Sequence, residues 1–334
     1  MFLGILRLIA TMLIMVPALA AAEPIKLKLA YYSSDRSVLY LAGIKPFVNA
    51  VNAAAKDLIH IDVYFSSALG PVDEEPQLVL NGAADIAFMI PGYTPKVFYD
   101  GSVVELPGLF HSAREATLVY TGLAARHAFK SYDNFVVLGA FTSEPESVHS
   151  RRAIATLADL KGLKLRVNNA TEAAAMGQLG AVPVLLPITK TTNAISDGTL
   201  DAAMVPPAML FEFGIGRVTN NHYMIRTSAA LMLLAMNRQS FERLPDAAQK
   251  IIEKYSGAWA ADRYVDTIEA LNASVTEQLA SDPKRKLVMP SPADRAIAQR
   301  AFDRVIQDWT GTDPEKARQL ALLRSELAKV RPDE

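Results

Sequence analysis

Residues 159–207 constrain the fold of this 334-residue chain more than any other stretch, because their pattern alternates between strand and helix. Residues 163–167 read Leu-Lys-Leu-Arg-Val, and this alternation of apolar and basic residues has the period of two that is typical of a strand. An Ala-rich segment then ends at Gly180, where a helix C-terminus favours a residue that can take a positive φ. Apolar runs at 182–187 and 200–207, separated by a second helical segment, complete a strand–helix–strand–helix–strand unit. The stretch therefore predicts an α/β fold.

Arg166 is the first candidate for a ligand-binding residue. It lies near the carboxyl end of the predicted strand, just before a helix that Asn169 or Thr171 can cap. In an open α/β sheet, ligands bind at the carboxyl ends of the strands, and the free N–H groups of the helix add a partial positive charge. A guanidinium group at this place can hold a carboxylate by two parallel hydrogen bonds. The alternative is a surface arginine that pairs with an acid of the protein itself.

Length and composition indicate a globular protein of two domains. Hydrophobic residues make up 51% of the chain, charged residues make up 21%, and the net charge is −1. Because basic runs such as 284–286 are short, we predict no nucleic-acid partner.

The first 22 residues predict a cleaved signal peptide. Arg7 is the only charge before Glu23, and an apolar segment from Leu8 ends in small residues that suit signal peptidase. The alternative is a membrane anchor, but the apolar segment is shorter than the roughly 20 residues that a span needs. We therefore expect a periplasmic protein.

The sequence offers no motif for catalysis, metal binding or a cofactor. The chain contains 0 cysteines, which excludes disulfides, thiolate metal sites, cysteine nucleophiles and a lipoprotein anchor. It has no Gly-x-Ser-x-Gly elbow, no His-Glu-x-x-His and no phosphate-binding loop, and its 5 histidines lack the spacing of metal ligands. We predict a protein that is not an enzyme and that needs no cofactor or metal.

The rest of the chain predicts a second α/β unit and a helical C-terminal part. The strand, helix, strand, helix and strand patterns of the first half fall at residues 25–31, 38–56, 59–65, 74–80 and 85–90. Further patterns predict a helix at 112–129, strands at 135–141 and 229–237, one helix from 245 to about 279 with a weak point at Gly257, and two helices within 292–328. Two such units facing each other leave a cleft lined by the carboxyl ends of their strands. On pattern alone, any two strand–helix–strand units look alike.

Several motifs give the chain a family resemblance. They are Asp-Leu-Lys-Gly-Leu-Lys-Leu-Arg at 159–166, Leu-Gly-Ala-Val-Pro-Val at 179–184 and Asp-Gly-Thr-Leu-Asp at 197–201, together with 67–70, 81–88 and 105–110 in the first half. With these motifs the chain resembles the DctP-type solute-binding proteins of tripartite ATP-independent periplasmic (TRAP) transporters. The resemblance covers nearly the whole chain after the predicted signal peptide.

The resemblance implies a two-lobed periplasmic-binding-protein fold (type II-like) with a hinge and a long helix that spans both lobes. We expect residues 23–140 plus 228–270 to form the first lobe, and 141–227 plus 271–334 to form the second, which carries Arg166. By this resemblance, the protein is a monomeric receptor in which Arg166 binds the carboxylate of a small organic acid. It delivers that acid to the small and large subunits of a membrane permease. A receptor for a sensor kinase and a secreted hydrolase are the alternatives.

Two departures from the family pattern bear on the ligand. Val205 stands where better-known members have an asparagine that binds substrate, and Glu146 replaces a second arginine. A small diacid would then leave one carboxylate poorly paired in a dry cleft, which is unfavourable. We therefore expect a monocarboxylate with an apolar or aromatic body.

Further candidates lie at predicted strand ends or in the loops that follow them. Aromatic rings and thioethers for ligand packing are offered by Tyr31, Tyr32, Phe88, Met89, Tyr93 and Met204, for which core packing is the alternative. His149 can donate a hydrogen bond to the ligand or be an ordinary loop residue. Asn168 can complete the hydrogen bonds of the carboxylate or, like Asn169, cap the helix.

Overall fold

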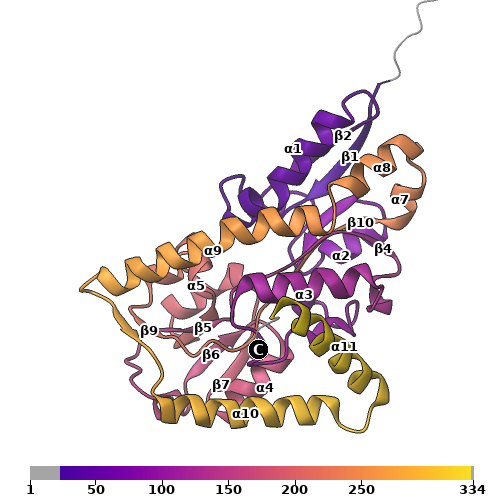
Figure 1. Cartoon of the computed structure of the whole chain (residues 1–334). Helices are drawn as coiled ribbons and strands as arrows, with labels where there is room; N and C mark the ends of the chain where they lie inside the picture. The colour runs from indigo at the N-terminus through magenta and orange to yellow at the C-terminus, as the bar shows by residue number, and fades with distance from the viewer. Residues whose placement is uncertain (1–22, 332–334) are drawn as a thin grey trace, which may run out of the picture.

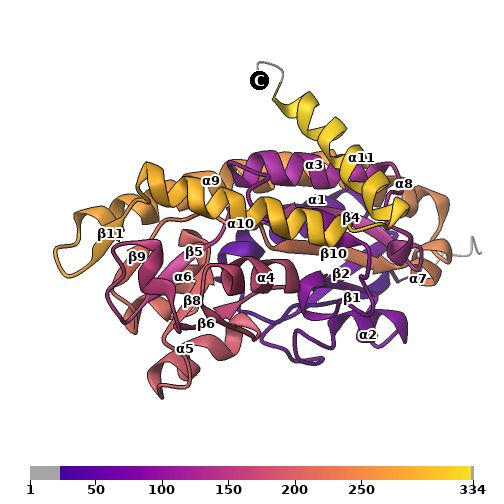
Figure 2. The same cartoon turned by 90° about the horizontal axis from the view of Figure 1, so that it is seen from below.

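The computed structural model describes residues 23–331, so the predicted signal peptide at 1–22 lies outside the described residues. The described chain forms two sheets, one of 5 strands in the order β2-β1-β3-β10-β4 and one of 6 strands in the order β11-β9-β5-β8-β6-β7. Seen from below, the two sheets lie side by side with helices across them (Figure 2). Within residues 23–331, no helix combines the length and the apolar character that a bilayer crossing requires.

The first sheet contains the early strands and one late one. Its strands are β1 (Ile25–Ala30), β2 (Ile59–Tyr64), β3 (Ile86–Met89), β4 (Phe135–Thr142) and β10 (Leu231–Asn237). β1 pairs in parallel with β2 and β3, whereas β10 runs antiparallel between β3 and β4. Its helices are α1 (Lys45–Ala54), α2 (Glu75–Leu80) and α3 (Ala113–Ala125), and α1 continues a π-helical turn at Tyr40–Ile44. α1 packs on β2, α2 on β3 and α3 on β4.

The second sheet contains the unit predicted from residues 159–207. Its strands are β5 (Ser147–Ser150), β6 (Lys164–Val167), β7 (Val182–Leu185), β8 (Ala202–Val205), β9 (Asn221–Tyr223) and β11 (Lys286–Val288). Its helices are α4 (Ala170–Gln178), α5 (Ile188–Ser196) and α6 (Pro207–Glu212). β6 lies parallel between β7 and β8, so Arg166 sits on a central strand of this group. The predicted strand–helix alternation is confirmed here.

A long helix connects the two sheets, but the prediction of one helix from 245 to 279 was wrong. The chain forms α7 (Arg238–Glu242), α8 (Asp246–Lys254) and α9 (Ala258–Ser281). The break falls at Gly257, whose φ of 58° and ψ of −123° suit glycine and few other residues. α9 packs against α3 and β4 on one side and against α6 and β11 on the other, so it spans both lobes (Figure 1).

The two C-terminal helices, α10 (Pro292–Thr310) and α11 (Pro314–Val330), turn at Gly311 as predicted. α10 packs against α4 beside the second sheet, whereas α11 returns to α3, which covers the first. The predicted division placed all of 271–334 in the second lobe, although α11 buries Leu320 and Leu323 against the first. The lobe boundaries stay a prediction.

Candidate functional site

A cavity lies where the two sheets and α9 meet. The first lobe contributes residues that follow β1, β3 and β4, the second lobe contributes residues of β6, α5 and α6, and α9 closes the cavity from the side. The lining includes Tyr32, Leu39, Ile90, Tyr93, Glu144, Glu146, Arg166, Asn168, Ile188, Met209, Phe213, Met232, Tyr264, Ile268 and Asn272. Most of these are apolar or aromatic, so the few polar groups fix the chemistry of the site.

Arg166 lies in the wall of this cavity with 1% of its surface exposed. Its Nε donates to the carbonyl of Leu186 at 2.8 Å, and its Nη1 donates to the carbonyl of Met204 at 2.7 Å. These bonds hold the guanidinium plane in one orientation. Burial acts to lower the pKa of Arg166, but its interactions with the Tyr93 hydroxyl and with the buried acids Glu146 and Glu172 outweigh this effect, so its pKa is raised and the cation is retained.

Tyr93 brings a hydroxyl group from the first lobe to Arg166. Its oxygen accepts one hydrogen bond from Arg166 Nη2 at 2.8 Å and another from the backbone N–H of Ile188 at 2.9 Å. Both donors belong to the second lobe, so one hydroxyl group joins the two lobes. Because the oxygen accepts from both, the hydroxyl proton of Tyr93 remains available as a donor.

Asn168 adds a second available donor. Its Oδ1 accepts from Arg166 Nη2 at 3.1 Å, while its Nδ2 has no hydrogen-bond partner among the described residues. The neighbouring Asn169 caps α4, since its side chain accepts from the backbone N–H of Glu172 at 2.8 Å. Asn169 therefore takes the capping role, whereas a ligand contact of Asn168 stays a prediction.

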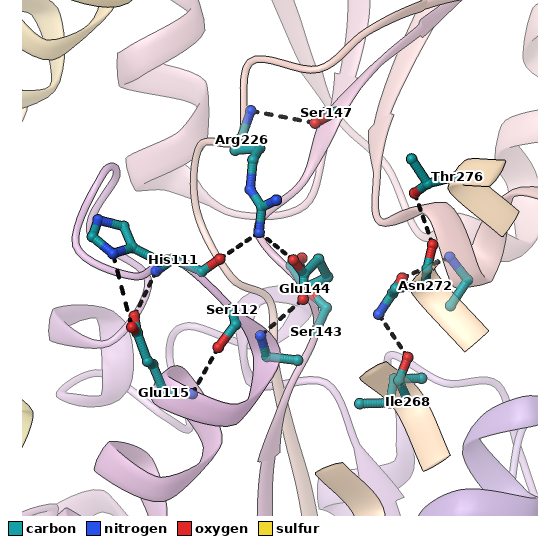
Figure 3. Close-up of polar contacts among 12 residues, drawn as sticks. His111, Ser112, Glu115, Ser143, Glu144, Ser147, Arg226, Ile268, Asn272 and Thr276 are labelled. Atoms are coloured by element: carbon teal, nitrogen blue, oxygen red, sulfur yellow. Dashed lines mark hydrogen bonds and ion pairs between the residues drawn. The ribbon is translucent and has the colours of Figure 1, made fainter. Parts of the chain in front are cut away.

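Two other polar side chains of the lining, Glu144 and Asn272, are committed to the protein (Figure 3). Glu144 accepts from Arg226 and, at 2.9 Å, from the backbone N–H of Ala113. The Oδ1 of Asn272 accepts from the backbone N–H of Ala208 at 2.9 Å, and its Nδ2 donates to the carbonyl of Ile268 at 3.0 Å. These side chains join α9 and the loop before β5 to their surroundings.

A further contact crosses between the lobes near the cavity. Glu212, at the end of α6, accepts from the backbone N–H of Val38 at 3.0 Å and from the hydroxyl of Ser33 at 3.4 Å. Both partners follow β1 in the first lobe. Together with Tyr93, this carboxylate forms direct hydrogen bonds between the lobes.

The structure brings Tyr32, Tyr93, Arg166 and Asn168 to the cavity, but the lining does not include the predicted residues Tyr31, Phe88, Met89, His149, Met204 and Val205. Phe88 packs between Tyr31 and Phe141, with ring centroids at 5.7 and 6.3 Å. The side chains of Met204 and Val205 are fully buried in the core on β8. Met204 contributes to the site through its carbonyl group, which Arg166 contacts.

His149 is held in a buried chain of hydrogen bonds on β5. Its Nε2 donates to the carbonyl of Val205 at 3.2 Å, so its Nδ1 accepts from His222 Nδ1 at 2.7 Å. His222 Nε2 then accepts from Arg285 Nη1 at 3.4 Å. These hydrogen bonds require both imidazoles to be neutral. The prediction that His149 contacts the ligand was wrong in its placement, because His149 is not among the residues that line the cavity.

Replacing His149 with glutamine is expected to flatten the acid side of the stability profile. Burial lowers the pKa of His149 to about 3 and that of His222 to about 4, whereas unfolded histidine titrates near 6.5. The stability that the neutral histidines contribute above pH 6.5 is therefore lost as the pH falls, because the histidines bind protons in the unfolded chain but not in the folded protein. Glutamine can replace the hydrogen bonds of the neutral imidazole but does not titrate. In urea unfolding measured between pH 7.5 and 5.0, the slope of the unfolding free energy against pH should therefore be smaller in the variant by up to about 1.4 kcal/mol per pH unit.

The control is His60→Gln, because the side chain of His60 is 51% exposed and should leave the slope unchanged. Equal slopes of unfolding free energy against pH for the wild type and His149→Gln would contradict the inference that His149 and His222 are neutral in the folded protein.

Several lining residues are not among the candidates that the sequence predicts. Glu146 enters there only as the loss of an arginine, and Met209, Phe213, Tyr264 and Ile268 are not predicted as site residues. The last four lie on α6, just after α6 and on α9, and reach the cavity through tertiary packing. No local signal distinguishes them from core residues.

The architecture defines the class of two-lobed bacterial solute receptors, in which a ligand lies between two α/β lobes. Residues 29–312 match the model of the bacterial extracellular solute-binding protein family 7 (DctP), and the chain belongs to that family. The family resemblance stated from the sequence is thus confirmed.

Two relatives and one solved structure illustrate the family. The chain is 24% identical over 211 residues to a solute-binding protein of Verminephrobacter eiseniae, covering 62% of this chain and 63% of that one. It is 24% identical to the C4-dicarboxylate-binding periplasmic protein DctP of Rhodobacter capsulatus, covering 72% of each chain. A marine metagenome TRAP solute-binding protein specific for aromatic acid ligands, solved with metahydroxyphenylacetate, superimposes with a TM-score of 0.85 at 22% identity, covering 91% of this chain and 99% of that one.

Proposed function

We propose that this protein is the periplasmic receptor of a TRAP transporter and that it captures a small monocarboxylate with an apolar or aromatic body. The observation that carries the proposal is the buried guanidinium of Arg166 in the wall of an apolar cavity. Beside it, Tyr93 and Asn168 keep donors available. A carboxylate is the group that one fixed cation and converging neutral donors bind best.

The charge of the lining favours a monocarboxylate over a dicarboxylate. Among the described lining residues Arg166 is the only cation, whereas Glu144 and Glu146 are acids. A second ligand carboxylate would be buried without a positive partner, which is unfavourable in a closed cleft. The relative from Rhodobacter capsulatus is named for C4-dicarboxylates and the metagenome protein for aromatic acids, and this lining resembles what an aromatic monoacid needs.

The proposed mechanism is binding without chemical change. The ligand enters between open lobes, Arg166 holds its carboxylate, and contacts from both lobes favour closure. The closed receptor then docks as a monomer on the small and large permease subunits. We expect a dissociation constant near the micromolar range, equivalent to about −8 kcal/mol.

A thermal-shift screen tests the proposal. Benzoate, phenylacetate and branched aliphatic monoacids are compared with succinate and malate, since a ligand at 100 times its dissociation constant stabilises by about 2.7 kcal/mol. We expect the largest shift from a monoacid, and mass spectrometry should recover that acid unchanged. Stronger stabilisation by succinate or malate would contradict the proposal, and conversion of the acid would show an enzyme.

A further inference from the structure

Glu146 is a polar group of the cavity that carboxylate binding leaves unused. Its backbone N–H donates to the carbonyl of Ser228 at 2.9 Å, and its carbonyl accepts from the N–H of Thr227 at 2.9 Å, so its position is fixed by the backbone. Its side chain is 4% exposed and lines the cavity, with Oε2 at 3.8 Å from Arg166 Nη1. That oxygen has no hydrogen-bond partner among the described residues. A buried carboxyl oxygen in a ligand cavity without a donor calls for one from the ligand.

The surroundings of Glu146 favour a neutral donor over a cationic one. Glu172, which is also buried, accepts from the backbone N–H of Asn168 at 3.0 Å and from the hydroxyl of Thr227 at 2.8 Å. Burial raises the pKa of Glu172 too, but these two hydrogen bonds act against that rise and favour its carboxylate form. Burial first, and then the charge of Glu172, raise the pKa of Glu146 well above its usual range. Of the two, Glu146 is the one that stays neutral. A neutral carboxyl group accepts from a hydroxyl group but has no charge with which to hold an ammonium group.

The distance from Glu146 to Arg166 restricts where the ligand's donor lies. A carboxylate that contacts Arg166, Tyr93 and Asn168 leaves its adjoining carbon next to Glu146, because Glu146 and Arg166 are only 3.8 Å apart. A hydroxyl group on that carbon can reach Glu146, whereas apolar lining residues such as Met209 and Phe213 offer no acceptor to a hydroxyl group elsewhere on the ligand.

We propose that Glu146 is a specificity-determining residue that accepts a hydrogen bond from the 2-hydroxyl group of the ligand, so that the receptor selects 2-hydroxy monocarboxylates. The proposal rests on the proposed function and names the ligand class of the same cavity. A plain monocarboxylate fills the cavity but leaves the carboxyl oxygen of Glu146 without a donor. Sites built to hydrogen-bond a hydroxyl group discriminate strongly against analogues that lack it.

The test compares acids that differ by one hydroxyl group. Mandelate (each enantiomer) is compared with phenylacetate, and 2-hydroxyisocaproate with isocaproate, by isothermal titration calorimetry on the wild type, Glu146→Gln and Glu146→Leu. We expect the wild type to prefer the hydroxy acid of at least one pair by about 10- to 100-fold, the range of one unsatisfied buried polar group. Glutamine retains an acceptor and should keep the preference, whereas leucine should remove it while plain acids still bind.

Each outcome separates the two proposals. Binding of plain monoacids as tightly as their hydroxy partners, or an unchanged preference in Glu146→Leu, would overturn the role of Glu146 while leaving the receptor function intact. Tighter binding of phenylglycine than of mandelate would overturn it as well, since that result requires an ionised Glu146. Failure of every monoacid to bind the wild type would overturn the proposed function, and the inference with it.

Discussion

Replacing Arg166 with lysine is expected to weaken binding of the monocarboxylate by about 30- to several-thousand-fold, the 2–5 kcal/mol typical of breaking a buried charged pair. Lysine keeps the positive charge but cannot reproduce the planar fork of Arg166. That fork contacts the carbonyls of Leu186 and Met204 and the side chains of Tyr93 and Asn168 at once. Isothermal titration calorimetry with the acid that gives the largest thermal shift measures the change.

The alanine variant of Arg166 is expected to lose binding almost completely, with the secondary structure intact by circular dichroism. Its melting temperature should fall, because Glu172 then lies buried without its cation. The matched control is Arg318→Ala, since Arg318 pairs with Glu315 on the surface with 55% of its side chain exposed. Unchanged affinity in both Arg166 variants would exclude Arg166 as the carboxylate anchor.

Replacing Tyr93 with phenylalanine is expected to weaken binding by about 10- to 100-fold, since hydrogen bonds to charged groups contribute about 1.5–3 kcal/mol. The ring still fills its place, but the acceptor shared by Arg166 and the N–H of Ile188 is lost, and so is the donor that Tyr93 offers the ligand. Because this hydroxyl group joins the lobes, small-angle scattering with saturating ligand should show a larger radius of gyration for the variant.

Tyr99→Phe provides the control for Tyr93→Phe. Tyr99 belongs to the same segment after β3 and is 62% exposed, so the loss of its hydroxyl group should change neither affinity nor compaction. If Tyr93→Phe binds and compacts like the wild type, the bridge between the lobes has no role in capture.

The local parts of the site could be predicted from the sequence, and the tertiary parts could not. The alternation at 163–167 placed Arg166 on a strand end, and the strand-end rule also found Tyr32, Tyr93 and Asn168. The same rule failed for Phe88 and Met204, whose side chains are buried in the core. Nothing local indicates that His149 pairs with His222, which lies 73 residues away in sequence. Met209 and Tyr264 reach the cavity only because α6 and α9 pack there, and their pattern is that of any buried helix face.

The contacts of Tyr93 and Glu212 across the two lobes bear on how a permease could tell a full receptor from an empty one. A ligand can shift the balance between open and closed forms only by its preference for one of them. Hydrogen bonds between the lobes lower the free energy of the closed conformation, so less of the ligand's intrinsic affinity is spent on closure. The same bonds raise the share of vacant receptors that imitate loaded ones. Strong contacts of Tyr93 and Glu212 therefore favour tight binding of a scarce ligand, whereas weak contacts favour a reliable difference between loaded and vacant receptors.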